Sequence, residues 1–126
     1  MTTSYLFHGG PILTMADGAA RPEALLSDTT YNMQLGMTEY RGHLDRYGGS
    51  LVLAAASYNA GPGNAKKWLA ANGDPRSGDP IDWIEQIPFS ETRNYVQRVL
   101  ENTEVYRARL AGKDVPLRIL PDLYAP

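Results

Sequence analysis

Apolar residues recur every three or four positions along most of this chain, a spacing that predicts helices rather than strands. The first such series lies between Asp28 and Gly48. Its members are Met33, Met37, Tyr40, Leu44 and Tyr47. Ser27 or Asp28 would cap this helix at its start. Gly48-Gly49 would end it, because glycine readily takes the left-handed conformation found at helix C-termini.

The next segment, Leu51–Tyr58, is apolar on every side (L-V-L-A-A-A-S-Y), and Ser50 precedes it as a cap. Such a helix is typical of one buried on most of its faces. We therefore expect it to need neighbours around its whole circumference. An uncovered face would favour self-association of the chain. Two glycines and a proline in Asn59–Gly63 end the helix.

Three further helices are expected downstream. Two are short and carry one tryptophan each: about Asn64–Asn72, and a segment that starts at Asp79 or Asp82 and closes before Pro88. The third is the longest, from Glu91 to about Leu110, with Ser90 as its cap. Its apolar face consists of Tyr95, Val96, Val99, Leu100, Tyr106 and Leu110. No strand pattern competes, so the predicted fold class is all-α.

The chain has 126 residues, the length of one domain. Residues 1–21 show no sustained period and contain several glycines, which predicts an irregular N-terminal arm. Residues 22–110 carry the helical pattern and form the expected domain. Residues 111–126 contain three prolines and predict a Pro-rich, extended tail.

Charge and composition exclude several classes of function. The net charge of −2 comes without a cluster of basic residues, so no nucleic-acid partner is expected. There is no cysteine, and His8 and His43 lie far apart, so we expect no metal and no other cofactor. His43 reads as a half-exposed helix residue. No apolar run is long enough to span a membrane, and the N-terminus lacks the basic and apolar regions of a secretory signal.

The most informative segment is Y-N-A-G-P-G, at residues 58–63. Its glycines and proline allow a tight turn and a close approach of the backbone to a ligand. Tyr58 offers a ring face and a hydroxyl, and Asn59 offers an amide, which are groups that suit sugar rings and their substituents. A helix-stopping turn in which Asn59 binds its own backbone explains the same residues equally well.

The second informative segment is I-P-F-S-E-T-R-N-Y-V, at residues 87–96. Glu91 falls in the first turn of the predicted long helix, where a carboxylate is favoured by the helix dipole. Local physics alone is satisfied if Glu91 serves only to stabilise the start of the helix.

Together, A-A-A-S-Y-N-A-G-P-G-N-A-K-K-W-L and I-D-W-I-E-Q-I-P-F-S-E-T-R-N-Y-V-Q-R-V-L-E-N resemble the soluble lytic transglycosylase family. Upstream, Asn32, Gly36 and Tyr40 fit a helix of the same family. The resemblance runs in order over about Pro22–Leu110. It implies the C-terminal portion of a goose-type-lysozyme-like helical domain.

The resemblance also implies an activity and a site. Such enzymes are carbon–oxygen lyases that cleave the bond between N-acetylmuramic acid and N-acetylglucosamine in peptidoglycan, and the location implied is the periplasm or cell envelope. One glutamic acid protonates the glycosidic oxygen and then deprotonates the muramyl C6 hydroxyl, closing a 1,6-anhydro ring. The substrate-binding residues implied here are Tyr58, Asn59, Ala60, Gly61 and Glu91.

The family's catalytic glutamate stands in an E-S motif that is followed by G-L-M-Q, and this sequence contains neither motif. Glu23 and Glu39 are not followed by serine. We therefore assign no catalytic residue and expect a copy truncated on its N-terminal side. Three interpretations stay open: an incomplete lytic transglycosylase, a non-catalytic glycan-binding remnant, and a helical interaction module.

Overall fold

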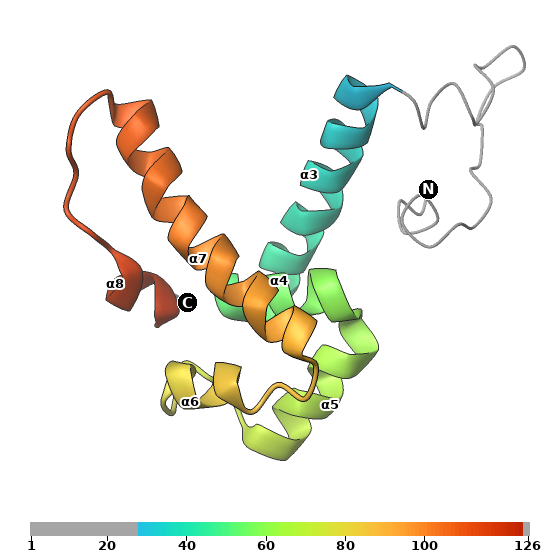
Figure 1. Cartoon of the computed structure of the whole chain (residues 1–126). Coiled ribbons are helices and arrows are strands. Elements are labelled where there is room, and N and C mark those ends of the chain that lie inside the picture. Colours follow the sequence, from blue (N-terminus) through green and yellow to red (C-terminus); the bar gives the residue numbers. More distant parts are fainter. Residues whose placement is uncertain (1–27, 125–126) are drawn as a thin grey trace, which may run out of the picture. The chain divides into compact units, whose positions relative to one another are not determined.

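The structure is a computed structural model that describes residues 28–124 (Figure 1). Within this range the chain forms six helices and no strand, which confirms the all-α class. Contacts divide the chain into two compact units after Gly42, and each unit is described by itself. The expected N-terminal arm, residues 1–21, lies outside the described residues.

The first unit contributes most of helix α3 (Thr29–Arg46). Asp28 caps it as predicted, because the Asp28 carboxylate accepts a hydrogen bond from the Tyr31 N–H at 2.9 Å. Met33 and Met37, which we expected on a buried face, are exposed. In the described part of this unit α3 is the one element present, so no other helix of the unit covers them.

The second unit is built around helix α4 (Leu51–Ala60). Ser50 caps it by accepting a hydrogen bond from the Leu53 N–H at 3.3 Å. Residues 52–56 have exposed fractions of 1% or less. The helix packs against α5 (Pro62–Asn72), α7 (Ser90–Ala111) and α8 (Ile119–Leu123).

The predicted burial of α4 is therefore confirmed, but the expected uncovered face is wrong. Neighbours from its own chain cover this helix, since α5, α7 and α8 all follow it in sequence. Self-association of the chain is left as an untested expectation, and the surface that we assigned to it is not available.

Helices α5 and α6 (Pro80–Glu85) follow the predicted segments, each with a buried tryptophan. Each begins with proline, which suits the first helical turn because the N–H it lacks would have no helical partner there. Asp79 caps α6 with its carboxylate, which accepts from the N–H groups of residues 81 and 82 at 2.8 and 3.2 Å. The Trp83 indole donates to the Gly73 carbonyl at 2.9 Å, linking the two helices.

Helix α7 starts at Ser90 rather than after it, so the predicted Ser90 cap is wrong. Phe89 occupies the cap position and makes no side-chain capping bond. Two other contacts hold this start. The Phe89 ring meets Trp68 edge to face at 5.5 Å, and the Arg93 guanidinium donates to the Ile87 carbonyl at 3.0 Å.

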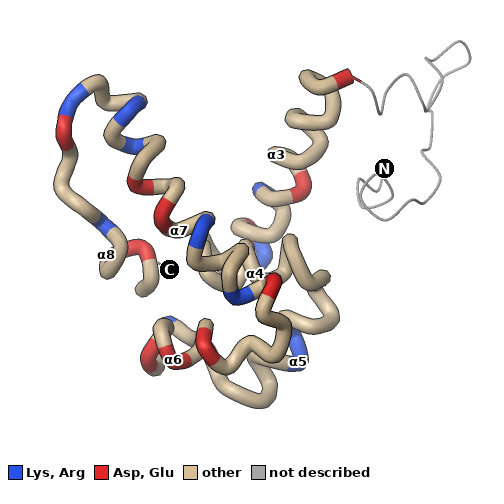
Figure 2. The backbone as a smooth tube through the Cα atoms, in the orientation of Figure 1, with Lys and Arg blue, Asp and Glu red and all other residues tan. Residues whose placement is uncertain are grey.

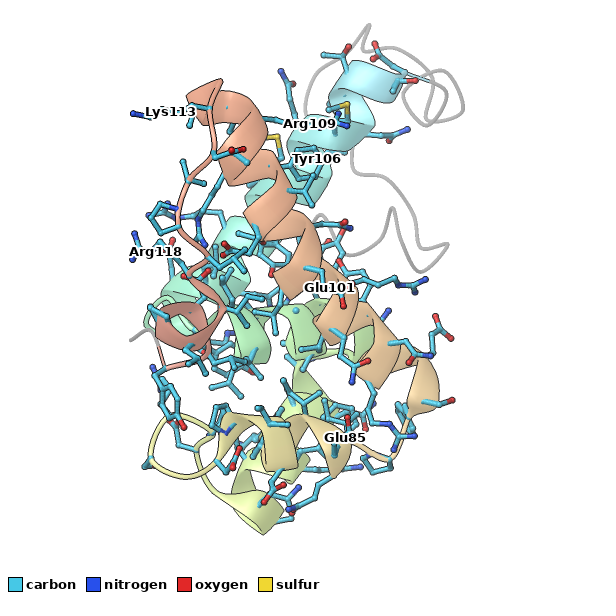
Figure 3. The ribbon with its side chains drawn as sticks, turned by 60° about the vertical axis from the view of Figure 1, so that its left-hand side comes forward. Glu85, Glu101, Tyr106, Arg109, Lys113 and Arg118 are labelled. Carbon is cyan, nitrogen blue, oxygen red and sulfur yellow. The ribbon has the colours of Figure 1, made fainter. Side chains whose placement is uncertain are left out.

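The segment that we expected to be an extended tail contains α8, which is attached to α7 by a buried charge cluster. Arg107 on α7 donates to the carboxylates of Glu104 and Asp122, and Glu104 also accepts from the Arg118 N–H at 2.9 Å. Both carboxylates are buried. Arg109 and Lys113 lie farther along, at the C-terminal end of α7 and just beyond it (Figure 3).

Replacing Arg107 with glutamine should release α8 from α7. Two buried carboxylates would then lose their cationic partner, which costs about 1–3 kcal/mol for a charged group left without its hydrogen bonds. Hydrogen exchange measured by mass spectrometry should show faster exchange over residues 119–123. Arg109→Gln is the matched control because Arg109 is exposed. Equal protection of this segment in both variants would show that the cluster does not hold α8.

Candidate functional site

The Y-N-A-G-P-G segment is the junction between α4 and α5. Tyr58 and Asn59 lie in the last turn of α4, and Gly61 links the two helices with a φ of 87°. This positive φ strains any residue with a Cβ, so the turn requires glycine at position 61. Gly63 lies inside α5, and its φ is not positive. The tight turn predicted from both glycines therefore depends on Gly61.

A hydrogen bond joins the two segments that the sequence singled out. The Thr92 hydroxyl donates to Oδ1 of Asn59 at 2.7 Å, across 33 residues of sequence. Thr92 is buried, whereas Asn59 is half-buried. Because its oxygen is taken, Asn59 presents its Nδ2 group as a donor, and no described residue accepts a hydrogen bond from it. The amide is thus held in one orientation.

Three aromatic rings, those of His43, Tyr58 and Tyr95, contact one another at the same junction. Tyr58 stacks on Tyr95 of α7, with ring centroids 6.2 Å apart and an angle of 21° between the planes. The Tyr58 ring also meets the His43 ring in a T-shaped contact, with centroids 6.1 Å apart and an angle of 86° between the planes. Tyr58 and Tyr95 are both half-buried. Burial first, and then the neighbouring Tyr58, raise the pKa of the Tyr95 hydroxyl.

His43 is buried, so its predicted half-exposed position is wrong. It sits in the last turn of α3, where Nδ1 lies 3.0 Å from the hydroxyl of Ser57. That hydroxyl accepts a long hydrogen bond, 3.5 Å, from Tyr47. Ser57 is then free to donate its own hydrogen to Nδ1 of a neutral imidazole. Burial, followed by the charge of Arg46, lowers the pKa of His43.

The other predicted site residues are less closely connected. The Ala60 carbonyl accepts from the Asn64 amide at 2.8 Å, so it serves the turn. Glu91 lies in the first turn of α7 next to Thr92, with its side chain exposed. Within residues 28–124, Glu91 makes no hydrogen bond or ion pair with Tyr58 or Asn59. The structure thus brings together Tyr58, Asn59 and Gly61, with Glu91 at the margin.

Sequence reasoning missed Thr92, Tyr95 and His43 as members of this site. Thr92 and Tyr95 are three residues apart on a helix, so they share a face. The predicted apolar face of that helix already included Tyr95. What sequence could not indicate is that the face meets the end of α4 rather than another element, because that depends on how the two helices pack.

The junction offers groups that suit a neutral, hydroxyl-rich ligand. A fixed amide donor and a half-buried tyrosine ring lie at the end of α4, and the exposed Glu91 carboxylate lies in the first turn of α7. Within residues 28–124 no group of three or more histidine, aspartate or glutamate side chains is placed to hold a metal ion. No helix in this range has the length and apolar character needed to cross a membrane.

Comparison with known proteins connects this chain to a family. The family model described as "Transglycosylase SLT domain" matches residues 13–78, more than half of the chain. A second, "Soluble lytic transglycosylase helical domain", matches residues 86–114. The chain therefore belongs to the transglycosylase SLT domain family. This confirms the predicted resemblance and with it the lysozyme-like type of helical domain.

Among individual relatives, the soluble lytic murein transglycosylase of Escherichia coli K12 is 36% identical over 96 residues, 76% of this chain. The protein of the same name from Salmonella typhimurium is 38% identical over 93 residues, 74% of this chain. The aligned region spans 14% of the length of each of these relatives. No solved structure gives a significant match. The domain boundaries at residues 22 and 110 stay predictions.

The lowered pKa of His43 makes stability depend on pH in a stated direction. Because the folded state holds this histidine neutral, its contribution to stability is complete above the unfolded pKa of about 6.5 and is lost as pH falls below it. Unfolding by urea at a series of pH values should show this loss. Arg46→Gln should move the His43 pKa upward and shrink the loss, and NMR titration of the imidazole reports that pKa directly. A His43 pKa at or above the ordinary value would contradict this account.

Proposed function

We propose that this chain forms the glycan-holding side of a peptidoglycan lytic transglycosylase. The proposal assigns sugar binding to Tyr58, Asn59, Ala60, Gly61 and Glu91, with Thr92 and Tyr95 as positioning residues. The ligand is the glycan strand of the bacterial cell wall, which places the protein in the periplasm or cell envelope. Membership of the SLT family and the names of the curated relatives support this assignment.

The observation that carries the proposal is the hydrogen bond from Thr92 to Asn59. It joins the two sequence segments from which the family resemblance was inferred, and it leaves the Asn59 amide N–H groups as donors for a ligand. A fixed amide donor is suited to the carbonyl of an N-acetyl group, which every sugar of a peptidoglycan strand carries. An ordinary helix-ending turn would not need a partner 33 residues away.

The Tyr58 ring supplies the second contact. Its stacking on Tyr95 and its edge contact with His43 hold it in place, so little side-chain freedom is lost when a sugar binds. The apolar face of a sugar ring packs against an aromatic ring, while hydroxyl groups around the rim find polar partners. Phe89, exposed at the start of α7 and held edge to face by Trp68, is a further aromatic ring close to Glu91 in sequence.

Bond cleavage requires a carboxylic acid whose pKa is raised by an apolar setting, so that it can give and then retake a proton. We place this acid outside the 126 residues, in the E-S motif of the family. Binding and proton donation are then contributed by different segments of the parent enzyme. The chain by itself should hold glycan and should not release 1,6-anhydromuropeptides.

Insoluble peptidoglycan should retain the purified chain, and Tyr58→Ala should weaken retention about three- to tenfold, because an aromatic contact contributes ~0.5–1.5 kcal/mol. Tyr58→Phe should keep most of the binding, since the ring remains. Bound fractions are measured by sedimentation of the polymer, and the supernatant is searched for anhydromuropeptides by mass spectrometry.

Tyr106→Ala is the matched control. Tyr106 is exposed and lies toward the C-terminal end of α7, away from α6 (Figure 3). Equal retention of the Tyr58→Ala and Tyr106→Ala proteins would reject the assigned surface. No retention of the unmodified chain would favour the helical interaction module instead.

A further inference from the structure

A concave site includes Pro62 and Gly63 of the Y-N-A-G-P-G segment and is lined by residues that the glycan site does not use. It is a cavity of about 330 Å³. Its lining consists of Arg46, Tyr47, Pro62, Gly63, Lys66 and Leu69. This volume is at the lower end of the range of pockets that hold small-molecule ligands.

One face of α5 forms the apolar floor and one cationic edge of this cavity. Pro62, Lys66 and Leu69 are spaced four and three residues apart, so they lie along a single face of the helix. Pro62 and Leu69 provide apolar surface, and Gly63 lets a ligand approach the backbone because nothing lies within 4 Å of its missing Cβ.

The opposite wall is formed by Arg46 and Tyr47, where α3 ends. Tyr47 is held from two sides. Its carbonyl accepts from the Arg76 guanidinium at 3.0 Å, and its hydroxyl donates to Ser57 at 3.5 Å. Arg76 is itself paired with Asp74 at 2.6 Å, which neutralises that acidic group. These two hydrogen bonds hold Tyr47 in place, and neither of them involves the Arg46 guanidinium.

Two cations thus border one apolar cavity with no acidic residue in its lining. Within residues 28–124, neither the Arg46 nor the Lys66 side chain makes an ion pair or a hydrogen bond. The helix that lines this cavity is basic, although the chain as a whole has a net negative charge. Helix α5 contains two lysines and no carboxylate, whereas α6 contains carboxylates and no cation (Figure 2).

We propose that this cavity binds a carboxylate group carried on a short aliphatic chain, with Arg46 and Lys66 holding the carboxylate and Pro62 and Leu69 contacting the aliphatic part. Building on the proposed function, the source of such a group is the peptide branch of peptidoglycan, which presents alanyl side chains and free carboxylates. The turn at Gly61 then separates a sugar site from a peptide site.

Both cations are exposed, so each contact is screened and contributes modestly. The expected binding of an isolated peptide is weak, in about the millimolar range. Such a contact gains importance when the peptide is tethered to a glycan strand already held at Tyr58, because the second contact becomes intramolecular.

NMR titration of the full chain tests the proposal with N-acetyl-dialanine that has a free C-terminal carboxylate. The titration is run at about pH 8, where His43 stays neutral in every variant. The backbone N–H signals of Gly63 and Leu69 should shift. Arg46→Gln and Lys66→Gln should each weaken binding about two- to fivefold, the range expected for the loss of one exposed charge contact. Lys67→Gln is the matched control, because Lys67 is exposed on the same helix and does not line the cavity.

Two further probes test the two cations and the apolar floor separately. The same dialanine with a C-terminal carboxamide should not bind, and inorganic phosphate should bind more weakly than the peptide. Equal binding of the carboxamide would overturn the role of the two cations. Equal binding of phosphate would overturn the role of the apolar floor, and absence of any shift with the peptide would overturn the site itself.

Chitotetraose, a glycan without peptide, separates this proposal from the function on which it rests. It should shift the signals of Tyr58 and Tyr95 equally in the unmodified chain and in both cavity variants. If chitotetraose does not bind while the peptide does, the sugar assignment fails and the cavity assignment stands. If chitotetraose binds and the peptide does not, the reverse holds.

Discussion

Burial of α4 is the constraint on which the second unit depends. Residues 52–56 are almost fully enclosed, and three of them are alanines. Small side chains allow neighbouring helices to come close, so α5, α7 and α8 all pack against this one helix. Helices α5, α7 and α8 are then placed by their contacts with α4, and the start of α7 carries Thr92.

The candidate site is a consequence of that packing. The end of α4 carries Tyr58 and Asn59, and the α7 face beside it carries Thr92 and Tyr95. Their contacts, a 2.7 Å hydrogen bond and a ring stack at 6.2 Å, connect segments that are distant in sequence. After the glycine turn at residue 61, helix α5 contributes Lys66 to a separate cavity that Arg46 also borders. One buried helix thus positions both of the proposed recognition surfaces.

Much of this was predictable from sequence because it is local. Helix positions followed from apolar spacing, and the Asp28, Ser50 and Asp79 caps followed from residue type. Features that depend on packing were not predictable. His43 is buried because Ser57 and Tyr58 lie beside it, and α8 forms because Arg107 binds Asp122. Residue type also predicted Ser90 as the cap of α7. In the structure, contacts of Phe89 and Arg93 hold the start of this helix instead.

The central claim is that Asn59 and Thr92 act as one unit in holding glycan. A double-mutant cycle on chitotetraose affinity tests it most directly, using Asn59→Ala, Thr92→Val and the double variant, with folding of each verified by NMR. Because Thr92 orients the Asn59 amide, Thr92→Val should weaken chitotetraose binding when Asn59 is present. The same change should have little further effect once Asn59 is alanine. The expected coupling energy between the two positions is about 1 kcal/mol. Thr103→Val is the control, because the Thr103 hydroxyl donates to the Val99 carbonyl within α7. This change should show no coupling with Asn59→Ala. Effects of the Asn59 and Thr92 changes that add within about 0.3 kcal/mol would contradict the account.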